Sequence, residues 1–221
     1  MKYFLKIPFI ILLFFSCSQE KEIYQLNLKY LALGDSYTIG EGILFEHSYP
    51  KQIVNDISLI DSVRVIAKTG WTTDELIDTL DNLSLKKYDV VSLLIGVNNQ
   101  FRGYSIDNYV VEFENLLVRA INYSKDKSNL FVLSIPDYGV TPFGKTKGKE
   151  KIYSEINSYN NINRLISEKY NVMYFDITDI SREAESDTTL LANDKLHPSK
   201  KMYEMWVEKL KYQLIDSLKN S

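Results

Sequence analysis

The sequence predicts an α/β protein built on a parallel sheet with helices on both of its faces. From Lys29 onward, short apolar runs alternate with amphipathic stretches, and this alternation is typical of parallel sheets. The run at 88–95 is apolar on both faces except at Ser92, as expected for a central strand. No repeat or internal linker interrupts the pattern, and 221 residues suit one domain.

The expected strands and helices alternate in order along the chain. The first strand covers residues 28–33, and the stretch 47–58 that follows carries apolar residues at a helical spacing. Capping-type residues at 72–75 open the next helix. The remaining strands are expected at 63–67, 88–95, 130–135 and 172–175, and the remaining helices at 72–80, 106–124, 151–169 and 198–218. Residues 137–149 hold three glycines and a proline, so we expect a loop there that could act as a mobile flap.

The amino terminus has the organisation of an export signal. Lys2 and Lys6 precede an apolar run at residues 7–15 that is too short to span a bilayer as a mature helix. The run ends at Ser16-Cys17, and the position of Cys17 resembles the bacterial lipobox, whose cysteine carries the lipid. A plain anchor helix with an incidental Cys17 is the alternative.

These features predict the organisation of the chain. Residues 1–17 are interpreted as a lipoprotein-type signal peptide ending at Cys17, residues 18–28 as a tether and residues 29–221 as the folded domain. The domain is then exported and anchored to a membrane through lipidated Cys17, on its periplasmic or cell-surface face. The formal net charge is −3 and the basic residues are scattered, so we expect no nucleic-acid partner. A single cysteine excludes a disulfide framework.

Polar residues follow the carboxyl ends of the expected strands, which meet at one edge of a parallel sheet. Ser36 comes directly after the first strand, where an α/β protein can present a nucleophilic hydroxyl. Asp35 is expected to hold this turn through backbone hydrogen bonds. Gly70 follows the second strand and Asn98 the third. The Ser36 and Gly70 N–H groups and the Asn98 amide could donate hydrogen bonds to an oxyanion.

A serine nucleophile needs a base, and the sequence holds two histidines. His197 lies in Asp194-x-x-His197-Pro198, where the Asp194 carboxylate can reach one ring nitrogen and leave the other for Ser36. Pro198 suits the first turn of the last helix. His47 has no such partner and is interpreted as a surface or helix-start residue.

Four blocks in this order resemble the SGNH (GDSL-type) hydrolase family: Gly34-Asp35-Ser36-Tyr37, Gly70, Gly96-Val97-Asn98-Asn99 and Asp194-x-x-His197-Pro198. The resemblance covers roughly residues 30 to 210. It implies a three-layer α/β/α sandwich with a flavodoxin-like five-stranded parallel sheet, and an ester hydrolase that needs no metal or cofactor. By this resemblance Ser36 is the nucleophile, His197 the base and Asp194 its orienting acid, while Ser36, Gly70 and Asn98 form the oxyanion hole.

The resemblance leaves the ester open between a lipid ester and an O-acetylated carbohydrate. Asn99 stands where many members have aspartate, Ala67-Lys68-Thr69 precedes Gly70 where asparagine is frequent, and Met202-Tyr203 replaces the usual Gly-Tyr. Aromatic side chains can line an acyl pocket or stack on sugar rings. We expect Trp71, Tyr37 and Asn99 to line the substrate site; further aromatic residues near this edge are Phe101, Tyr104, Tyr138 and Phe143.

Two other interpretations compete with an esterase. The first is a carbohydrate-binding surface lipoprotein that keeps the fold without turnover. The second is nucleotide binding, because residues 139–146 match the P-loop pattern G-x-x-x-x-G-K-[ST]. Phe143 is bulky for a loop that wraps phosphate, and Pro142 lacks an amide donor. Lysines 145, 147, 149 and 151 are interpreted as a solvated face or as contacts for an anionic substrate.

Overall fold

Five parallel strands form the centre of the computed structural model, which describes residues 27–220. The strands lie in the order β2-β1-β3-β4-β5, which is the order of flavodoxin-like doubly wound sheets. This confirms the predicted fold class. The strands are β1 (Leu28–Gly34), β2 (Ile60–Ala67), β3 (Val90–Leu94), β4 (Leu130–Leu133) and β5 (Met173–Phe175).

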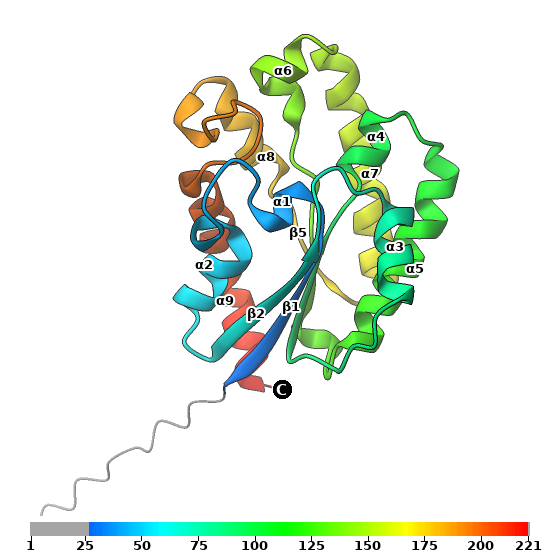
Figure 1. Ribbon diagram of the computed structural model, residues 1–221, viewed down its shortest axis with the longest axis vertical. Helices are drawn as coiled ribbons and strands as arrows, with labels where there is room; N and C mark the ends of the chain where they lie inside the picture. The colour runs from blue at the N-terminus through cyan, green and yellow to red at the C-terminus, as the bar shows by residue number, and fades with distance from the viewer. Residues whose placement is uncertain (1–26, 221) are drawn as a thin grey trace, which may run out of the picture.

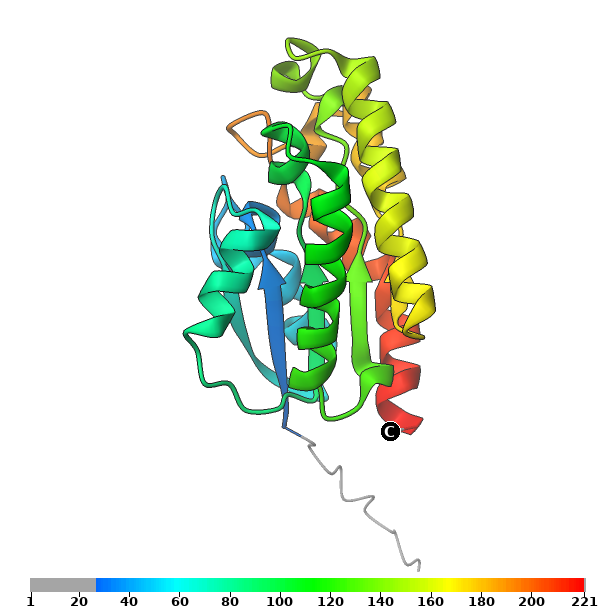
Figure 2. The same cartoon turned by 90° about the vertical axis from the view of Figure 1, so that its right-hand side faces the viewer.

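Helices cover both faces of the sheet (Figure 1). One face carries α2 (Tyr49–Asp56), α8 (Thr178–Arg182) and α9 (Lys200–Asn220), and the other carries α3 (Thr73–Asp81), α5 (Ile106–Tyr123) and α7 (Lys149–Lys169). Figure 2 shows α5 and α7 side by side along the length of the strands. Three short helices lie near the carboxyl edge of the sheet: α1 (Ser36–Ile39), α4 (Val97–Phe101) and α6 (Pro142–Lys145). Single 3-10 turns are η1 (Phe45–His47), η2 (Lys127–Asn129), η3 (Tyr138–Val140), η4 (Glu183–Glu185) and η5 (Thr188–Leu190).

The burial of the strands follows their place in the sheet. All five residues of β3 are buried, whereas the edge strand β2 exposes Asp61, Ser62 and Arg64. Ser92 breaks the apolar run of β3, and it is satisfied by a hydrogen bond of 2.6 Å between its Oγ and Tyr30 Oη. The central strands are therefore apolar on both faces because helices cover both.

The residues 137–149 are not the open loop that the glycines predict. Asp137 Oδ1 accepts a 2.9 Å hydrogen bond from Gly139 N and begins η3, and Thr141 Oγ1 accepts one of 3.0 Å from Gly144 N and begins α6. Gly144 packs so closely that a Cβ would lie 1.9 Å from Tyr138 O. Glycine here permits close packing of two short helices.

The last helix also begins later than predicted. Pro198 is not in its first turn but pairs with Leu191 in an isolated antiparallel bridge, and α9 starts at Lys200. The signal peptide at 1–17 and all but the last two residues of the tether at 18–28 lie outside the described residues, and Leu28 belongs to β1. Among residues 27–220, no helix has the length and apolar character needed to cross a membrane.

Candidate active site

The fold places Ser36 at the carboxyl edge of the sheet, beside the boundary between β1 and β3. Chain segments leave these neighbouring strands toward opposite faces of the sheet (Figure 1), and ligands of such folds bind at this switch point. The ends of the two strands approach closely, because a Cβ on Gly34 would lie 2.3 Å from Leu94 O. Ser36 and Asn98 follow β1 and β3, and Gly70 follows the neighbouring β2.

The turn that carries Ser36 is held by its neighbours. Asp35 caps α1, and its Oδ1 accepts a 3.0 Å hydrogen bond from Tyr37 N. From α9, Tyr203 Oη donates a 2.8 Å hydrogen bond to Tyr37 O. Ser36 opens the helix, so its N–H has no partner within the helix. The nucleophile candidate therefore lies on a short, anchored turn, with a backbone N–H that no group of residues 27–220 engages.

Asp35 itself is fully buried beside the candidate nucleophile. Within the described residues its Oδ2 has no hydrogen-bond partner. Burial raises the pKa of this carboxyl to about 7, although the hydrogen bond from Tyr37 N acts in the opposite direction. The capping role that the sequence predicts is thus filled by one oxygen only.

His197 and Asp194 form a pair within one tight turn. The distance from His197 Nδ1 to Asp194 Oδ2 is 2.7 Å, and Asp194 Oδ1 accepts hydrogen bonds from Leu196 N (2.9 Å) and His197 N (3.0 Å). A 2.8 Å hydrogen bond from Ala192 N to His197 O closes the turn. Partial burial raises the pKa of Asp194, but these hydrogen bonds outweigh burial and hold the pKa below its usual value. The carboxylate stays charged, and the ring is held by one nitrogen.

Two successive carbonyls of the turn after β2 are held by Asn98 in α4 and by Arg102, the C-cap residue of α4. Asn98 Nδ2 donates a 2.9 Å hydrogen bond to Trp71 O, and Arg102 Nη2 donates one of 2.6 Å to Gly70 O. Gly70 has a φ of +85°, a conformation that favours glycine. No side chain or backbone group of residues 27–220 accepts a hydrogen bond from the Gly70 N–H. The geometry leaves this N–H and the second Asn98 amide proton available.

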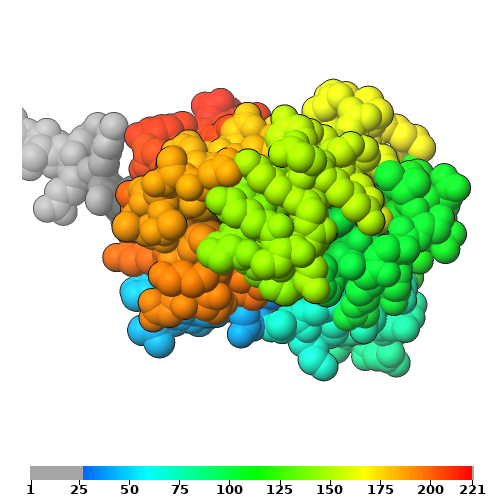
Figure 3. Space-filling view, turned by 90° about the horizontal axis from the view of Figure 1, so that it is seen from above, coloured from blue at the N-terminus to red at the C-terminus, as the bar shows by residue number. Residues whose placement is uncertain are grey.

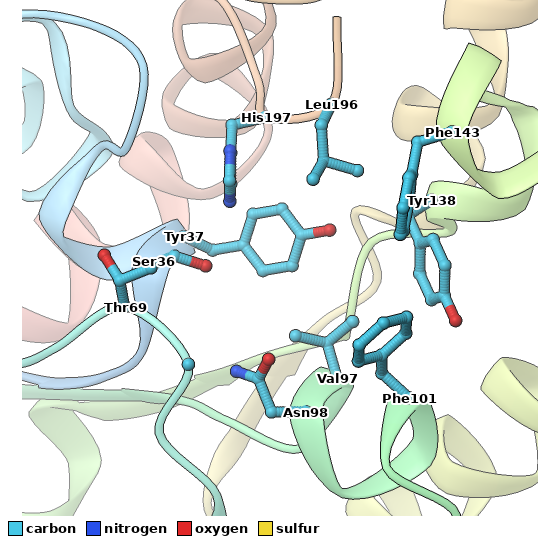
Figure 4. A pocket seen from close by; sticks show the side chains of 11 residues that line it. Ser36, Tyr37, Thr69, Val97, Asn98, Phe101, Tyr138, Phe143, Leu196 and His197 are labelled. Atoms are coloured by element: carbon cyan, nitrogen blue, oxygen red, sulfur yellow. The ribbon is translucent and has the colours of Figure 1, made fainter. Parts of the chain in front are cut away.

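These residues surround one cavity of about 200 Å³. In Figure 4 the His197 ring, the Ser36 hydroxyl and the Asn98 amide point into the same space from three parts of the chain. The opposite side is an aromatic wall of Phe101, Tyr138 and Phe143, with ring centroids 5.9 to 6.4 Å apart. Figure 3 looks down on this edge, where segments from early, middle and late parts of the chain meet. The cavity is lined by Ser36, Tyr37, Thr69, Gly70, Val97, Asn98, Phe101, Tyr138, Phe143, Leu196 and His197.

Two of the three residues expected to line the substrate site do not reach this cavity. Asn99 is fully buried, where its Oδ1 accepts a hydrogen bond from Thr73 N (3.1 Å) and its Nδ2 donates one to Thr73 Oγ1 (2.6 Å). Trp71 packs against the core and contributes only its carbonyl, which binds Asn98. Tyr37 does line the cavity, with its ring edge-on to His197 at 5.7 Å.

Sequence reasoning missed Val97 and Leu196 as lining residues. Thr69, which precedes Gly70 at the end of the second expected strand, also lines the cavity. Val97 and Leu196 directly precede Asn98 and His197, so adjacency to the motif residues was the available signal. It also missed Gly42, which lies against the site: a Cβ there would be 2.6 Å from Asp194 Oδ2. His47 ends η1 and is not among the lining residues.

The P-loop interpretation is wrong, because backbone N–H groups in the segment 139–146 already donate hydrogen bonds to nearby carbonyl groups. The N–H groups of Thr141, Lys145 and Thr146 donate to carbonyls within the segment 138–143. A phosphate cradle needs these donors free and convergent. Lys145 Nζ lies 3.5 Å from Glu185 Oε1 instead.

Residues 27–220 contain no group of three or more His, Cys, Asp or Glu side chains arranged to hold a metal ion.

Comparison with known families and structures shows which proteins this chain is similar to. The sequence profile of the GDSL-like Lipase/Acylhydrolase family matches residues 32–205, which include every residue of the candidate site. The chain is similar to the spore germination lipase LipC of Bacillus licheniformis, with 24% identity over 209 residues that cover 84% of this chain and 96% of the lipase.

Among the solved structures that share the fold are two esterases from bacteria. One is Axe2, an acetylxylan esterase from Geobacillus stearothermophilus, with a TM-score of 0.62, 20% identity and coverage of 85% of this chain and 94% of that chain. The other is the psychrotrophic esterase EstA from a Pseudoalteromonas species, inhibited by monoethylphosphonate in its structure. It has a TM-score of 0.63, 22% identity and coverage of 88% of this chain and 100% of that chain.

Proposed function

The chain belongs to the GDSL-like Lipase/Acylhydrolase family, and we propose that it is a serine esterase that hydrolyses carboxylic esters through a Ser36 acyl-enzyme. One observation carries the proposal. His197, paired with Asp194 at 2.7 Å, opens onto the same cavity as Ser36, Gly70 and Asn98. A nucleophile, a base and oxyanion donors are the parts that acyl transfer requires.

In the acylation step, Ser36 Oγ attacks the ester carbonyl carbon while His197 Nε2 accepts the hydroxyl proton. The carbonyl oxygen becomes an oxyanion and receives hydrogen bonds from the N–H groups of Ser36 and Gly70 and from the Asn98 amide. The Asp194 carboxylate stabilises the imidazolium that forms. The C–O bond to the alcohol then breaks, and His197 returns the proton to the leaving alcohol.

In the deacylation step, water attacks the acyl carbon and His197 accepts a proton from it. The same donors hold the second oxyanion. When the bond to Ser36 Oγ breaks, His197 protonates the serine and the carboxylic acid leaves. Each cycle consumes one ester and one water and restores the starting protonation states.

Labelling with a fluorophosphonate tests the proposed nucleophile and separates it from the carbohydrate-binding alternative. We expect one adduct on Ser36, since the reagent phosphonylates a serine only when a base activates it. Ser36→Ala should fold normally, take no label and lose ester hydrolysis. Folded wild-type protein that takes no label and cleaves no ester would establish the non-catalytic alternative.

We propose that the substrate carries a short acyl group, in the manner of an O-acetylated carbohydrate rather than a long-chain lipid ester. The cavity of about 200 Å³ is smaller than the roughly 300–1,000 Å³ of pockets that bury a drug-sized ligand. The aromatic wall of Phe101, Tyr138 and Phe143 limits its length. A series of p-nitrophenyl esters from acetate to decanoate should show the highest kcat/KM at acetate or propionate. A maximum at eight or more carbons would favour the lipid ester.

We further propose that the protein is exported and tethered to a membrane through lipidated Cys17. The support is the order of charged, apolar and small residues in the segment 1–17. In cells that lipidate exported proteins, the wild type should incorporate labelled palmitate and sediment with membranes. Cys17→Ser should do neither. A Cys17→Ser protein that still sediments after an alkaline wash would favour the plain anchor helix.

A further inference from the structure

A larger groove lies directly beside the catalytic cavity. Its volume is about 720 Å³, and it shares Phe101 and Tyr138 with the catalytic cavity as a common wall. The catalytic cavity is too small for a whole oligomeric ester, so the rest of such a substrate has to extend outside it. The groove is the neighbouring space that continues the site.

The groove is basic because two lysines line it. The segment 145–151 holds four lysines, of which two pair with Glu185 and two line the groove. Lys145 and Lys149 turn to Glu185, with Nζ to Oε1 distances of 3.5 Å and 2.6 Å. Lys147 and Lys151 line the groove instead. Among residues 27–220, Lys147 forms no ion pair and lies over the Phe143 ring, with Nζ 5.5 Å from the centroid.

Within the described part of the chain, Glu155 alone among carboxylates lines the groove, and it does not balance these charges. Glu155 Oε1 lies 3.8 Å from Lys151 Nζ, and its Oε2 accepts a 2.7 Å hydrogen bond from Gln100. The Arg102 guanidinium also faces the groove, but Gly70 O and Glu75 already engage it. The groove therefore keeps an excess of positive charge that an anionic group can meet.

The groove also presents aromatic surface. Phe101 is 48% exposed and Tyr104 is 42% exposed, and both line it. Exposed aromatic rings next to cations suit a ligand with an apolar face and an anionic substituent, a combination that an acidic sugar ring offers. A long lipid chain would not use the polar part of this surface.

We propose that the groove binds the alcohol portion of the substrate as an acidic sugar. Its carboxylate lies at Lys147 and Lys151, its ring contacts Phe101 or Tyr104, and its ester reaches Ser36 across the shared wall. This inference rests on the proposed esterase function and specifies the class of its substrate as an O-acetylated, uronic-acid-containing glycan.

The test compares two esters that differ only in charge: an O-acetylated oligogalacturonate and the same oligosaccharide with its carboxyl groups reduced to alcohols. For the wild type at low salt, we expect kcat/KM to be about fivefold higher for the acidic ester, since two exposed charge pairs contribute roughly 0.5 kcal/mol each. The preference should shrink as salt rises. In Lys147→Gln/Lys151→Gln it should disappear, and in the matched control Lys145→Gln/Lys149→Gln it should remain.

Equal kcat/KM values for the two esters, or an equal preference in both double variants, would overturn the inference. So would faster turnover of an acetylated glycerophosphate than of the acidic sugar. Hydrolysis of p-nitrophenyl acetate is measured beside each variant, because this neutral ester does not need the groove. If the wild type does not hydrolyse p-nitrophenyl acetate, the proposed esterase function is wrong. If it hydrolyses this ester but shows no preference for the acidic glycan, only the proposed role of the groove is wrong.

Discussion

Gly42 lies where the candidate active site tolerates no side chain. Its φ is +81°, and a Cβ would stand 2.6 Å from Asp194 Oδ2, the oxygen that bonds His197. The residue has no chemistry of its own. It matters because it leaves the Asp194 carboxylate room to hold the imidazole ring.

Gly42→Ala should therefore lower kcat for p-nitrophenyl acetate by at least about tenfold, because a displaced Asp194 no longer orients His197. Gly103→Ala is the matched control: Gly103 also has a positive φ, +68°, but no atom lies within 4 Å of its Cβ position. The control measures backbone strain alone. Equal loss of kcat in the two variants would contradict the role given to Gly42.

Asp35 predicts a specific dependence of stability on pH. Its pKa of about 7 in the folded protein exceeds the ordinary value of 3.8, so between these values the folded state holds a proton that the unfolded state has released. Raising the pH from 4 to 7 then favours unfolding, by up to about 4 kcal/mol from this group. The free energy of unfolding is measured by urea denaturation of the wild type and of Asp35→Asn at several pH values. The wild type should show this decline and the variant should not. An equal dependence on pH in both proteins would contradict the role given to Asp35.

At the scale of elements, α4 acts as a clamp on the turn after β2. Asn98 and Arg102 lie one helical turn apart, so both side chains face the same neighbour and bind Trp71 O and Gly70 O. Short helices such as α4 escape a periodicity search because five residues span little more than one turn. These two hydrogen bonds fix the position of Gly70 relative to Asn98, and both residues belong to the proposed oxyanion hole.

Arg102→Met should reduce kcat for p-nitrophenyl acetate by about tenfold with little change in KM, because a freed Gly70 turn weakens an oxyanion donor worth roughly 100-fold or more. The rate of fluorophosphonate labelling should fall in parallel. Arg119→Met is the control, since Arg119 pairs with Asp81 on α3 and does not line the cavity. An unchanged kcat in Arg102→Met would show that the hydrogen bond from Arg102 to Gly70 O does not position the oxyanion donor.

At the scale of the whole molecule, the start of β1 and the end of α9 lie at the opposite edge of the sheet from α1 and α6 (Figure 1). Within the described residues 27–220, those that line the cavity fall between 36 and 197. A variant that lacks residues 1–26 should thus keep kcat/KM for p-nitrophenyl acetate within about twofold of the full chain, since no backbone at the site is removed. A tenfold loss would mean that the amino-terminal segment contributes to the site.

The sequence alone was enough to predict the parallel sheet, its layers and the residues at its carboxyl edge, because strand and helix periods are local and parallel strands end together. The Asp194–His197 pair was predictable for the same reason, since three residues in one turn determine their separation. The direction of Trp71 and Asn99, the contact of Gly42 with Asp194 and the groove beside Phe101 depended on packing between segments far apart in the chain. Spacing along one segment carries no information on such contacts, so they emerged only when the helices and strands were assembled.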